Sequence, residues 1–390
     1  MVAPRLVNRS SLLSLVALLQ AIAGVRVAWR LARTAHGERI MTREAPVPGE
    51  RVTVILPVLN ERARLGPCLD GLVAQPGEVA EMLVIDGGSR DGTQELIAAY
   101  ARLDRRVRLV DAAPVPPGEN GKAHGLQVGL EQAEPASAWV LTIDADVRPN
   151  PALARSLLAH ACRTGAAMVS IATEQRLSGA AEGLVHPALL ATLVYRFGIP
   201  GHATRRVGEV QANGQCCLVR REPLEAGGGF RVGKGSVCED VTMARMVAAN
   251  GHLVGFYEAP GLATVEMYEG WRDAWRNWTR SLPMRDQYAG FSGWLGLAEI
   301  VLAQGLPLPL ALGLRWLAPT RRLVIGLNTG LLMMRIGVLA GMARAYPNRP
   351  WTYWLSPLSD LPAAVQLWRS AVRRRHAWRG RTLIRGHEGM

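Results

Sequence analysis

The chain has 390 residues, enough for one large catalytic core with additional elements. Its composition, 49% hydrophobic and 20% charged, is apolar for a soluble enzyme. The formal net charge is +13, but the basic residues flank apolar segments and do not alternate with exposed aromatics, which disfavours nucleic-acid binding. The five cysteines show no C-x-x-C spacing, which argues against a zinc site or a disulfide framework and favours reduced thiols.

The N-terminal segment Ser11–Ala28 is apolar and about long enough to cross a bilayer, with one late arginine, Arg26. A cleaved signal peptide is the alternative. No clear A-x-A cleavage site precedes the basic stretch 30–43, so we expect residues 1–30 to form an uncleaved membrane anchor.

Residues 50–285 alternate short β-rich runs with helical stretches. We expect strands at 52–58, 81–88, 107–112 and 138–146, a helix ending at 72, and helices at 93–103 and 122–132. This alternation predicts an α/β catalytic domain with a mostly parallel sheet and right-handed crossovers. Ligands of such sheets bind at the carboxyl ends of the strands.

Acidic residues stand where two of these strands end. Asp86 ends one strand, and Asp144 and Asp146 end another. Side chains repeat every two residues along a strand, so the last two carboxylates are expected on one side of the backbone. Such oxygen ligands suit Mg²⁺ or Mn²⁺ shared with a diphosphate. Aspartate is also common in turns, so the motif alone is a weak signal.

Two further polar segments each have a structural and a functional interpretation. The loop around Lys122 opens a helix, and is either an ordinary N-terminal cap or an anion site for phosphate; its spacing is not that of a Walker loop. Glu239 and Asp240 precede another helix, where they either complement its dipole or supply a general base.

The chain becomes apolar again after Trp294. The segments near 294–318, 323–345 and 351–368 are membrane candidates within a C-terminal region of membrane-associated helices, 290–370. Pro307 and Pro309 would break the first, which suggests a re-entrant or interfacial element. The second carries Arg335, which must face protein or a headgroup.

Arginine clusters follow the first anchor, occupy 315–322 and fill a basic tail, 371–390. Positive flanks stay cytoplasmic, which predicts an inner (plasma) membrane protein with residues 30–290, the 315–322 arginines and the C-terminus in the cytoplasm. The N-terminus would lie outside, and 294–318 would not cross.

Five segments in order resemble the motifs of glycosyltransferase family 2, the inverting enzymes with the GT-A fold. They are VILPVLNE (54–61), VIDGGSRDGT (84–93), NGKAHGLQVGL (120–130), LTIDADVRP (141–149) and VCED (237–240). The resemblance covers roughly residues 50–285. It implies a GT-A domain that takes a nucleotide-sugar donor, with N- and C-terminal transmembrane or interfacial helices around it.

The resemblance also implies roles on the donor side. Asp86 would contact the nucleobase, with Pro57 and Glu61 near the uridine. Asp144 and Asp146 would bind the ribose and the metal–diphosphate, with Mg²⁺ or Mn²⁺ as the cofactor.

On the acceptor side, Asn213 and Gly214 would lie by the sugar, and Asp240 would deprotonate the acceptor hydroxyl. Glu239, Trp275, Arg276 and Arg280 are candidates for the acceptor or diphosphate site. The tryptophans and arginines of 271–280 are equally typical of an interfacial aromatic belt on an amphipathic helix.

Two departures bear on function. Gly87 replaces the second aspartate of the nucleotide motif, which puts fine donor recognition in doubt. The segment 271–280 lacks the Q/R-x-x-R-W order of processive synthases, which disfavours polymer synthesis.

The layout also resembles that of bacterial enzymes that glycosylate carotenoids, hopanoids or ceramide-like lipids. We therefore expect non-processive transfer of a hexose, from UDP-hexose, to a membrane lipid at the cytoplasmic face. The alternatives are a processive polysaccharide synthase, a nucleotidyltransferase or an inactive lipid-binding scaffold. The sequence does not indicate the oligomeric state.

Overall fold

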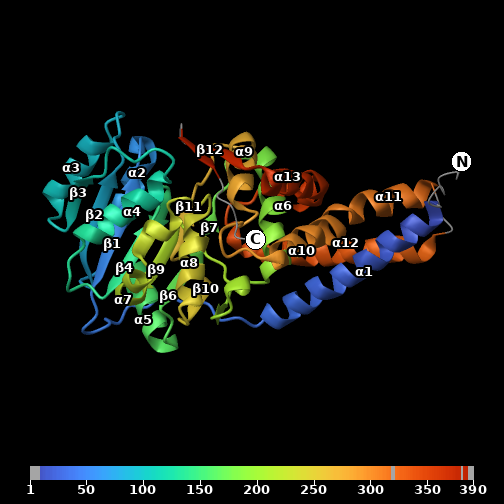
Figure 1. The fold of residues 1–390 in the computed structure, drawn as a ribbon, viewed down its shortest axis with the longest axis horizontal. Coiled ribbons are helices and arrows are strands. Elements are labelled where there is room, and N and C mark those ends of the chain that lie inside the picture. Colours follow the sequence, from blue (N-terminus) through green and yellow to red (C-terminus); the bar gives the residue numbers. More distant parts are fainter. Residues whose placement is uncertain (1–8, 318–320, 379–380, 385–390) are drawn as a thin grey trace, which may run out of the picture.

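The computed structural model describes the chain except for residues 1–8, 318–320, 379–380 and 385–390. It has two parts, an α/β domain and a bundle of long helices that projects from it (Figure 1). The helices of the α/β domain are α2 (Arg62–Val73), α3 (Thr93–Leu103), α4 (Gly121–Gln132), α5 (Leu153–Thr164), α6 (Ala180–Phe197), α7 (Arg221–Ala226), α8 (Glu239–Ala249) and α9 (Trp271–Ser281), with short 3-10 turns η1 (Val207–Glu209) and η2 (Gly229–Gly233).

An eight-stranded sheet forms the centre of the α/β domain. Its order is β3 (Val107–Asp111), β2 (Val79–Asp86), β1 (Val52–Val58), β4 (Trp139–Ile143), β9 (Cys216–Arg220), β6 (Met168–Ala172), β10 (Val254–Glu258) and β8 (His202–Thr204). The first four strands are parallel, and β9 runs antiparallel to both of its neighbours. The predicted mixed α/β fold with a mostly parallel sheet is confirmed.

Alternate residues of the strands bury against helices on opposite faces of the sheet. Val54 and Leu56 of β1 pack with α2, α3 and α5, whereas Ile55 packs with α4, α7 and α8. Gly129 permits the close approach of α4, because a Cβ there would lie 2.4 Å from Ile55 Cγ2. Both faces of the sheet are therefore covered, and ligands can reach it only at its edges.

A small second sheet lies beside the first. It has the order β5 (Val147–Pro149), β11 (Ala263–Val265) and β7 (Glu174–Gln175). β5 follows β4 after a turn of three residues, Asp144–Asp146. The strand predicted to run through Asp146 therefore ends at Ile143, and the two aspartates lie in the turn.

The bundle contains α1 (Arg9–Thr34), α10 (Phe291–Ile300), the π-helical turn η3 (Val301–Gly305), α11 (Pro307–Leu317) and α12 (Arg322–Met342). Three helical stretches of 24 residues each, Ser11–Thr34, Phe291–Leu314 and Arg322–Ala345, are long and apolar enough to cross a membrane. The interruption expected from the prolines is seen at Leu306, but Pro307 begins α11 in place of breaking it, since proline is tolerated at the first helical position.

Buried polar side chains in the described part of the bundle pair across its helices. Gln20 of α1 donates to Asn328 Oδ1 of α12 over 2.9 Å. Arg335 is 1% exposed and forms an ion pair of 2.9 Å with Asp360, which confirms that it faces protein.

The third C-terminal segment, 351–368, is not a candidate span. After the short turn η4 (Ala343–Ala345) it forms the 3-10 helix η5 (Trp351–Ser359) and most of α13 (Asp360–Val372), which pack on α6 and on the base of the bundle. Pro357 and the buried Asp360 account for this, because they favour a short, protein-covered element. A hairpin of β12 (Arg375–Trp378) and β13 (Arg381–Ile384) follows, and part of the predicted basic tail lies outside the described residues.

The end of α11 and the start of α12 lie at the end of the bundle farthest from the α/β domain, beside the start of α1 (Figure 1). Arg321 and Arg322 stand at the start of α12. The prediction that the 315–322 arginines share one side of a membrane with the α/β domain therefore requires that the bundle does not cross it.

Candidate active site

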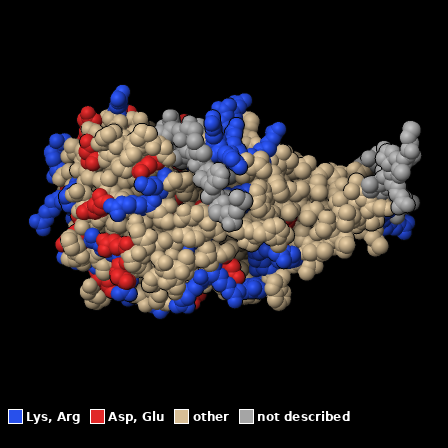
Figure 2. Space-filling model, in the orientation of Figure 1, with Lys and Arg blue, Asp and Glu red and all other residues tan. Residues whose placement is uncertain are grey.

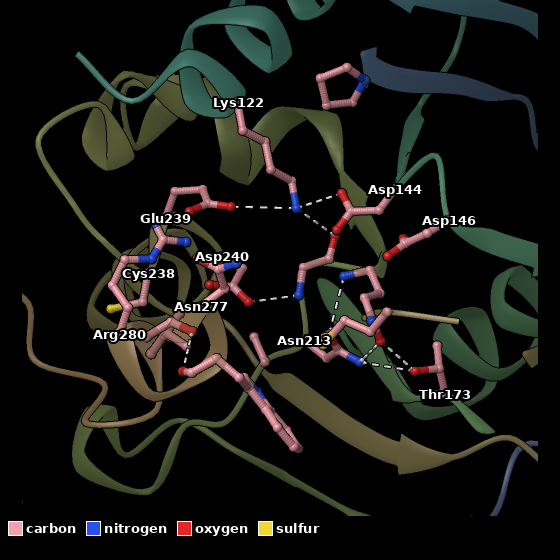
Figure 3. Close-up of a pocket in the computed structure, with 18 of the residues that line it drawn as sticks. Lys122, Asp144, Asp146, Thr173, Asn213, Cys238, Glu239, Asp240, Asn277 and Arg280 are labelled. Carbon is pink, nitrogen blue, oxygen red and sulfur yellow. Dashed lines mark hydrogen bonds and ion pairs between the residues drawn. The ribbon is translucent and has the colours of Figure 1, made fainter. Parts of the chain in front are cut away.

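One cavity of about 600 Å³ lies at the edge of the main sheet (Figure 3). The carboxyl ends of β1 and β4 reach it, as does the amino end of β9, because β9 runs in the opposite direction. The amino end of α8 completes this wall with Glu239 and Asp240. Residues from four separate segments thus meet at one point, as expected for an α/β sheet.

Lys122 stands at the centre of the acidic groups. Its Nζ lies 2.6 Å from Asp144 Oδ1 and 3.4 Å from Glu239 Oε1, and donates to the Gly214 carbonyl over 3.0 Å. Burial alone lowers the pKa of Lys122, but Asp144, Glu239 and Asp240 together raise it above its ordinary value. The lysine therefore remains charged and links two acidic segments, at Asp144 and at Glu239, to the carbonyl of Gly214.

Lys122 lies in the first turn of α4, and this helix has the N-terminal cap that one interpretation of the loop predicted. Asn120 Oδ1 accepts from the backbone amides of Lys122 and Ala123 at the start of α4. The cap is therefore confirmed, and the lysine faces the cavity. The phosphate site at this loop stays a prediction.

Asp146 has the environment of an incomplete ion site. Its Oδ1 is buried without a hydrogen-bond partner among the described residues, and burial together with the nearby Asp144 raises its pKa to about 7. A divalent cation would give the buried Asp146 oxygen a partner and would offset the repulsion between the Asp146 and Asp144 carboxylates. The described residues contain no group of three or more His, Cys, Asp or Glu side chains able to hold a metal. Two carboxylates at one turn would leave coordination positions of a divalent ion open to diphosphate oxygens.

The period-two argument for the two aspartates was wrong, since they lie in a turn and not on a strand. Both still line the cavity, and Asp144 N donates to the Gln215 carbonyl over 3.0 Å. The turn is thereby tied to the amino end of β9.

Asp240, unlike Asp146, has a backbone hydrogen-bond partner. Its Oδ2 accepts from Gly214 N over 2.6 Å. Burial and the adjacent Glu239 raise its pKa to about 6, although Lys122 acts in the opposite sense. Asp240 stands in the first turn of α8, so it also complements the helix dipole, as one of the two interpretations of this segment predicts. Its pKa suits a general base near neutral pH.

The segment 213–215 forms a fixed floor. Asn213 Nδ2 donates to the Ile171 carbonyl over 3.2 Å and to Gln215 Oε1 over 2.9 Å, while Asn213 Oδ1 accepts from Gln215 N over 3.2 Å. Thr173 donates to the same Gln215 oxygen over 2.5 Å. Both amide side chains are thus oriented by neighbouring groups, which makes this floor preorganised.

Helix α9 and the segment before it form another wall of the cavity. This wall contains Asp273, Asn277, Trp278, Arg280 and Tyr268, and Arg280 lies beside Glu239 (Figure 3). Leu190 and Leu193 of α6 and Ala345 of η4 add apolar surface, and both elements pack against helices of the bundle. The cavity therefore has charged residues from the sheet edge, α8 and α9 in its lining, together with apolar residues from elements that pack on the bundle.

Most of the residues predicted for the site line this cavity. They are Pro57, Glu61, Lys122, Asp144, Asp146, Asn213, Gly214, Glu239, Asp240 and Arg280. Three do not. Asp86 is fully buried and accepts from Gly88, Ser89 and Gln94, so it holds the turn after β2 and leaves the cavity wall to Gly87.

Trp275 and Arg276 are the other two. Trp275 packs against α13 and α10, and Arg276 is exposed on the outer side of α9. A helix turns by about 100° per residue, so only positions near 273, 277 and 280 share the face toward the cavity. The prediction that Trp275 and Arg276 line the site is therefore corrected.

Several lining residues were not predicted. Arg64, Thr173, Gln175, Gln215, Tyr268, Asp273, Asn277 and Trp278 belong to this group. Gln215 was within reach of sequence reasoning, since it directly follows Asn213 and Gly214. Thr173 and Gln175 carry no motif, because only the pairing of β6 with β9 brings them to this edge.

Comparison with known proteins agrees with this geometry. Residues 53–228 match the family described as glycosyl transferase family 2. The chain carries a glycosyl transferase family 2 domain. The match contains β1, Lys122, the Asp144–Asp146 turn and the 213–215 floor, but it ends before α8, so the position of Asp240 rests on the geometry alone.

The fold agrees with the same assignment. The chain is similar to the mannosyltransferase PcManGT from Pyrobaculum calidifontis, solved in complex with GDP-Man and Mn²⁺, with a TM-score of 0.54 and 20% identity. The match covers 92% of this chain and 98% of that one. The likeness confirms a GT-A fold together with helices outside the sheet.

Two curated relatives share shorter stretches. Glucosyl-3-phosphoglycerate synthase of Mycobacterium tuberculosis is 33% identical over 111 residues, 28% of this chain and 33% of that protein. Undecaprenyl-phosphate 4-deoxy-4-formamido-L-arabinose transferase of Pseudomonas aeruginosa is 31% identical over 109 residues, 27% of this chain and 31% of that protein. The chain thus matches about a third of the length of these relatives.

Proposed function

We propose that this family 2 domain transfers one sugar from a nucleotide-diphospho-sugar, a UDP-hexose, to the hydroxyl or carboxylate of a membrane lipid. One observation carries the proposal. The cavity is continuous from the acidic groups at the sheet edge to apolar residues of α6 and η4, elements that pack on the bundle. A lipid acceptor explains why these two surfaces share one cavity.

The donor is assigned to the sheet end of the cavity. Pro57 and Glu61 at the end of β1, with Gly87 beside them, line the part expected to receive the nucleoside. The domain's family supports a nucleotide-sugar donor. The glycine in place of a second aspartate removes one carboxylate from this wall, so base recognition relies more on backbone groups.

Mg²⁺ or Mn²⁺ is the proposed cofactor. Asp146 and Asp144 would hold it together with the donor diphosphate, and the ion would supply charge stabilisation to the departing diphosphate. The buried, unpartnered oxygen of Asp146 supports this assignment. Removing metal with a chelator is expected to abolish transfer, and added Mn²⁺ or Mg²⁺ to restore it.

Asp240 is the proposed base. Its carboxylate takes the proton from the acceptor oxygen as that oxygen attacks the anomeric carbon, while the bond from this carbon to the diphosphate oxygen breaks. Attack opposite the leaving group inverts the anomeric centre. Gly214 N, which donates to Asp240 Oδ2, fixes the direction of the carboxylate during this step.

Membrane placement follows from the surface of the bundle. Large apolar side chains face outward on it, among them Leu12, Leu15, Leu18, Ile22, Val25 and Leu323, and its visible face carries almost no charge (Figure 2). We propose that all three long stretches cross, so that the 315–322 arginines lie on the side opposite to the catalytic domain. This replaces the topology inferred from charge, and keeps the catalytic domain and α13 in the cytoplasm.

A reporter fused after Arg322 tests this placement. The proposal predicts that it reads as extracytoplasmic, while a reporter fused after Val372 reads as cytoplasmic. Cytoplasmic signals at both positions would show that the bundle does not cross.

The acceptor is tested separately. Membranes that contain the protein are incubated with a panel of labelled nucleotide sugars, and the extracted lipids are separated. A labelled lipid carrying one sugar is expected. Labelled polymer would instead indicate a polysaccharide synthase, and labelled nucleotide transfer would indicate a nucleotidyltransferase.

A further inference from the structure

Helix α9 has two faces with different roles. Asp273, Asn277 and Arg280 line the cavity, whereas Arg272 and Arg276 are exposed on the outer side. Trp271, 39% exposed, begins the helix, and the Arg272 guanidinium lies 5.0 Å from its ring. α9 is therefore a single layer between the active-site cavity and the outside of the molecule.

The outer side of α9 belongs to a larger basic surface. α13 packs beside α9 through Leu367 and Ala371, which share a cluster with Trp275 and Trp278. Exposed arginines from the two helices and the chain after α13 form what we call the basic strip: Arg272, Arg276, Arg369, Arg373, Arg374 and Arg375. Figure 2 shows basic side chains gathered over α9 and β12. Glu269, just before α9, is the exposed acidic residue next to them in sequence.

The strip has a distinctive position. It lies where the α/β domain meets the bundle, next to the uncharged surface of the long helices (Figure 2). Large apolar side chains are also exposed on elements that pack at the base of the bundle, with Phe291 at the start of α10 and Trp351 and Trp354 in η5. Aromatic residues and arginines between an apolar span and a polar domain are typical of the headgroup level of a bilayer.

We propose that the basic strip binds the anionic headgroups of the cytoplasmic leaflet and that this contact orders α9, and with it the wall of the active site. The inference rests on the proposed membrane placement. The partner is an anionic phospholipid bilayer, because continuity with the apolar bundle places the strip at a membrane surface and its charge complements phosphate. Lipid composition would then regulate transfer through a helix that carries cavity residues on its other face.

The test measures how well ordered α9 is, and it needs neither the sugar donor nor the lipid acceptor. The full-length protein is placed in nanodiscs of phosphatidylcholine, or of equal parts phosphatidylcholine and phosphatidylglycerol. Hydrogen exchange is then followed for the amides of Trp271–Ser281. We expect slower exchange in the anionic discs, with each arginine contributing about fivefold to the ratio of docked to undocked helix.

Matched variants distinguish an effect of the basic strip from an effect of the net charge of the protein. Arg272→Gln/Arg276→Gln should remove most of the lipid effect, and Arg369→Gln/Arg374→Gln should reduce it from the neighbouring helix. Arg102→Gln/Arg105→Gln removes two exposed arginines at the far side of the α/β domain and should leave it intact. Inorganic phosphate added to neutral discs should not reproduce it.

Equal exchange in both lipids for the wild type would overturn the proposal, as would an effect that survives both pairs of strip variants. An effect reproduced by inorganic phosphate would show an anion site in place of a bilayer contact. Failure of the proposed lipid transfer is seen independently, as the absence of a glycosylated lipid, and leaves the exchange result unaffected.

Discussion

Lys122 Nζ lies 2.6 Å from Asp144 Oδ1, and so joins the start of α4 to the turn after β4. The same ammonium group reaches Glu239 at the start of α8. A single cation therefore offsets carboxylates that come from two distant parts of the chain, and it stands where a diphosphate would bring further negative charge.

Replacing Lys122 with methionine keeps the length of the side chain and removes this charge. A charge-assisted hydrogen bond contributes about 1.5–3 kcal/mol, so the affinity for the donor is expected to fall by about 10- to 100-fold. Calorimetric titration with the nucleotide diphosphate measures this. Lys234→Met, at an exposed lysine outside the cavity, is the control and should bind normally. Unchanged affinity in Lys122→Met would remove the lysine from the donor site.

Asp240→Asn tests the base. The amide cannot accept the proton, so the rate of transfer should fall by about 10²- to 10⁴-fold, while binding of the nucleotide diphosphate stays close to that of the wild type. Glycolipid formation and nucleotide binding are measured on the same preparation. Transfer that survives the substitution would count against the assignment.

The pH profile gives a second test of Asp240. Its pKa of about 6 means that the reactive carboxylate is lost as the pH falls through this value, so kcat/KM should decline below about pH 6 and level off above it. Glu239 raises the pKa of Asp240, so Glu239→Gln should move the decline to lower pH. A decline that stays in place in Glu239→Gln, or one that moves to higher pH, would contradict this electrostatic account.

The buried pair of Arg335 and Asp360 predicts a stability effect. Asp360→Ala leaves the arginine charge buried and uncompensated at the base of the bundle, which should lower the free energy of unfolding by about 3–5 kcal/mol. Replacing both residues, as Arg335→Met with Asp360→Leu, should recover much of that loss. Thermal unfolding in detergent measures both. Equal losses in the single and double variants would indicate a packing defect instead.

Much of the fold could be predicted because local signals agree with it. The run Val52–Val58 and the helix Thr93–Leu103 have the predicted bounds, since buried β-branched runs and amphipathic periods report directly on local structure. The strand expected to continue through Asp146 ends earlier, because the turn to β5 depends on pairing with β11, which is distant in sequence.

The site residues that belong to recognisable sequence motifs could be predicted. Lys122, Asp144 and Asp240 were found because each begins or ends an element at the same edge of the sheet. Which side of α9 points into the cavity could not be predicted from its composition, since tryptophans and arginines occur on both sides of the helix. Asp86 was misplaced for a related reason, because its carboxylate satisfies the backbone of its own turn.

The most direct test of the central claim is the mass of the reaction product. The purified protein is reconstituted in nanodiscs with an extract of membrane lipids, Mn²⁺ and the donor identified from the panel, beside a matched Asp240→Asn sample. The account predicts that one lipid species gains the mass of a single sugar and that this product is lost in the variant. A series of masses that differ by repeated sugars, or release of the sugar to water with every lipid unchanged, would contradict it.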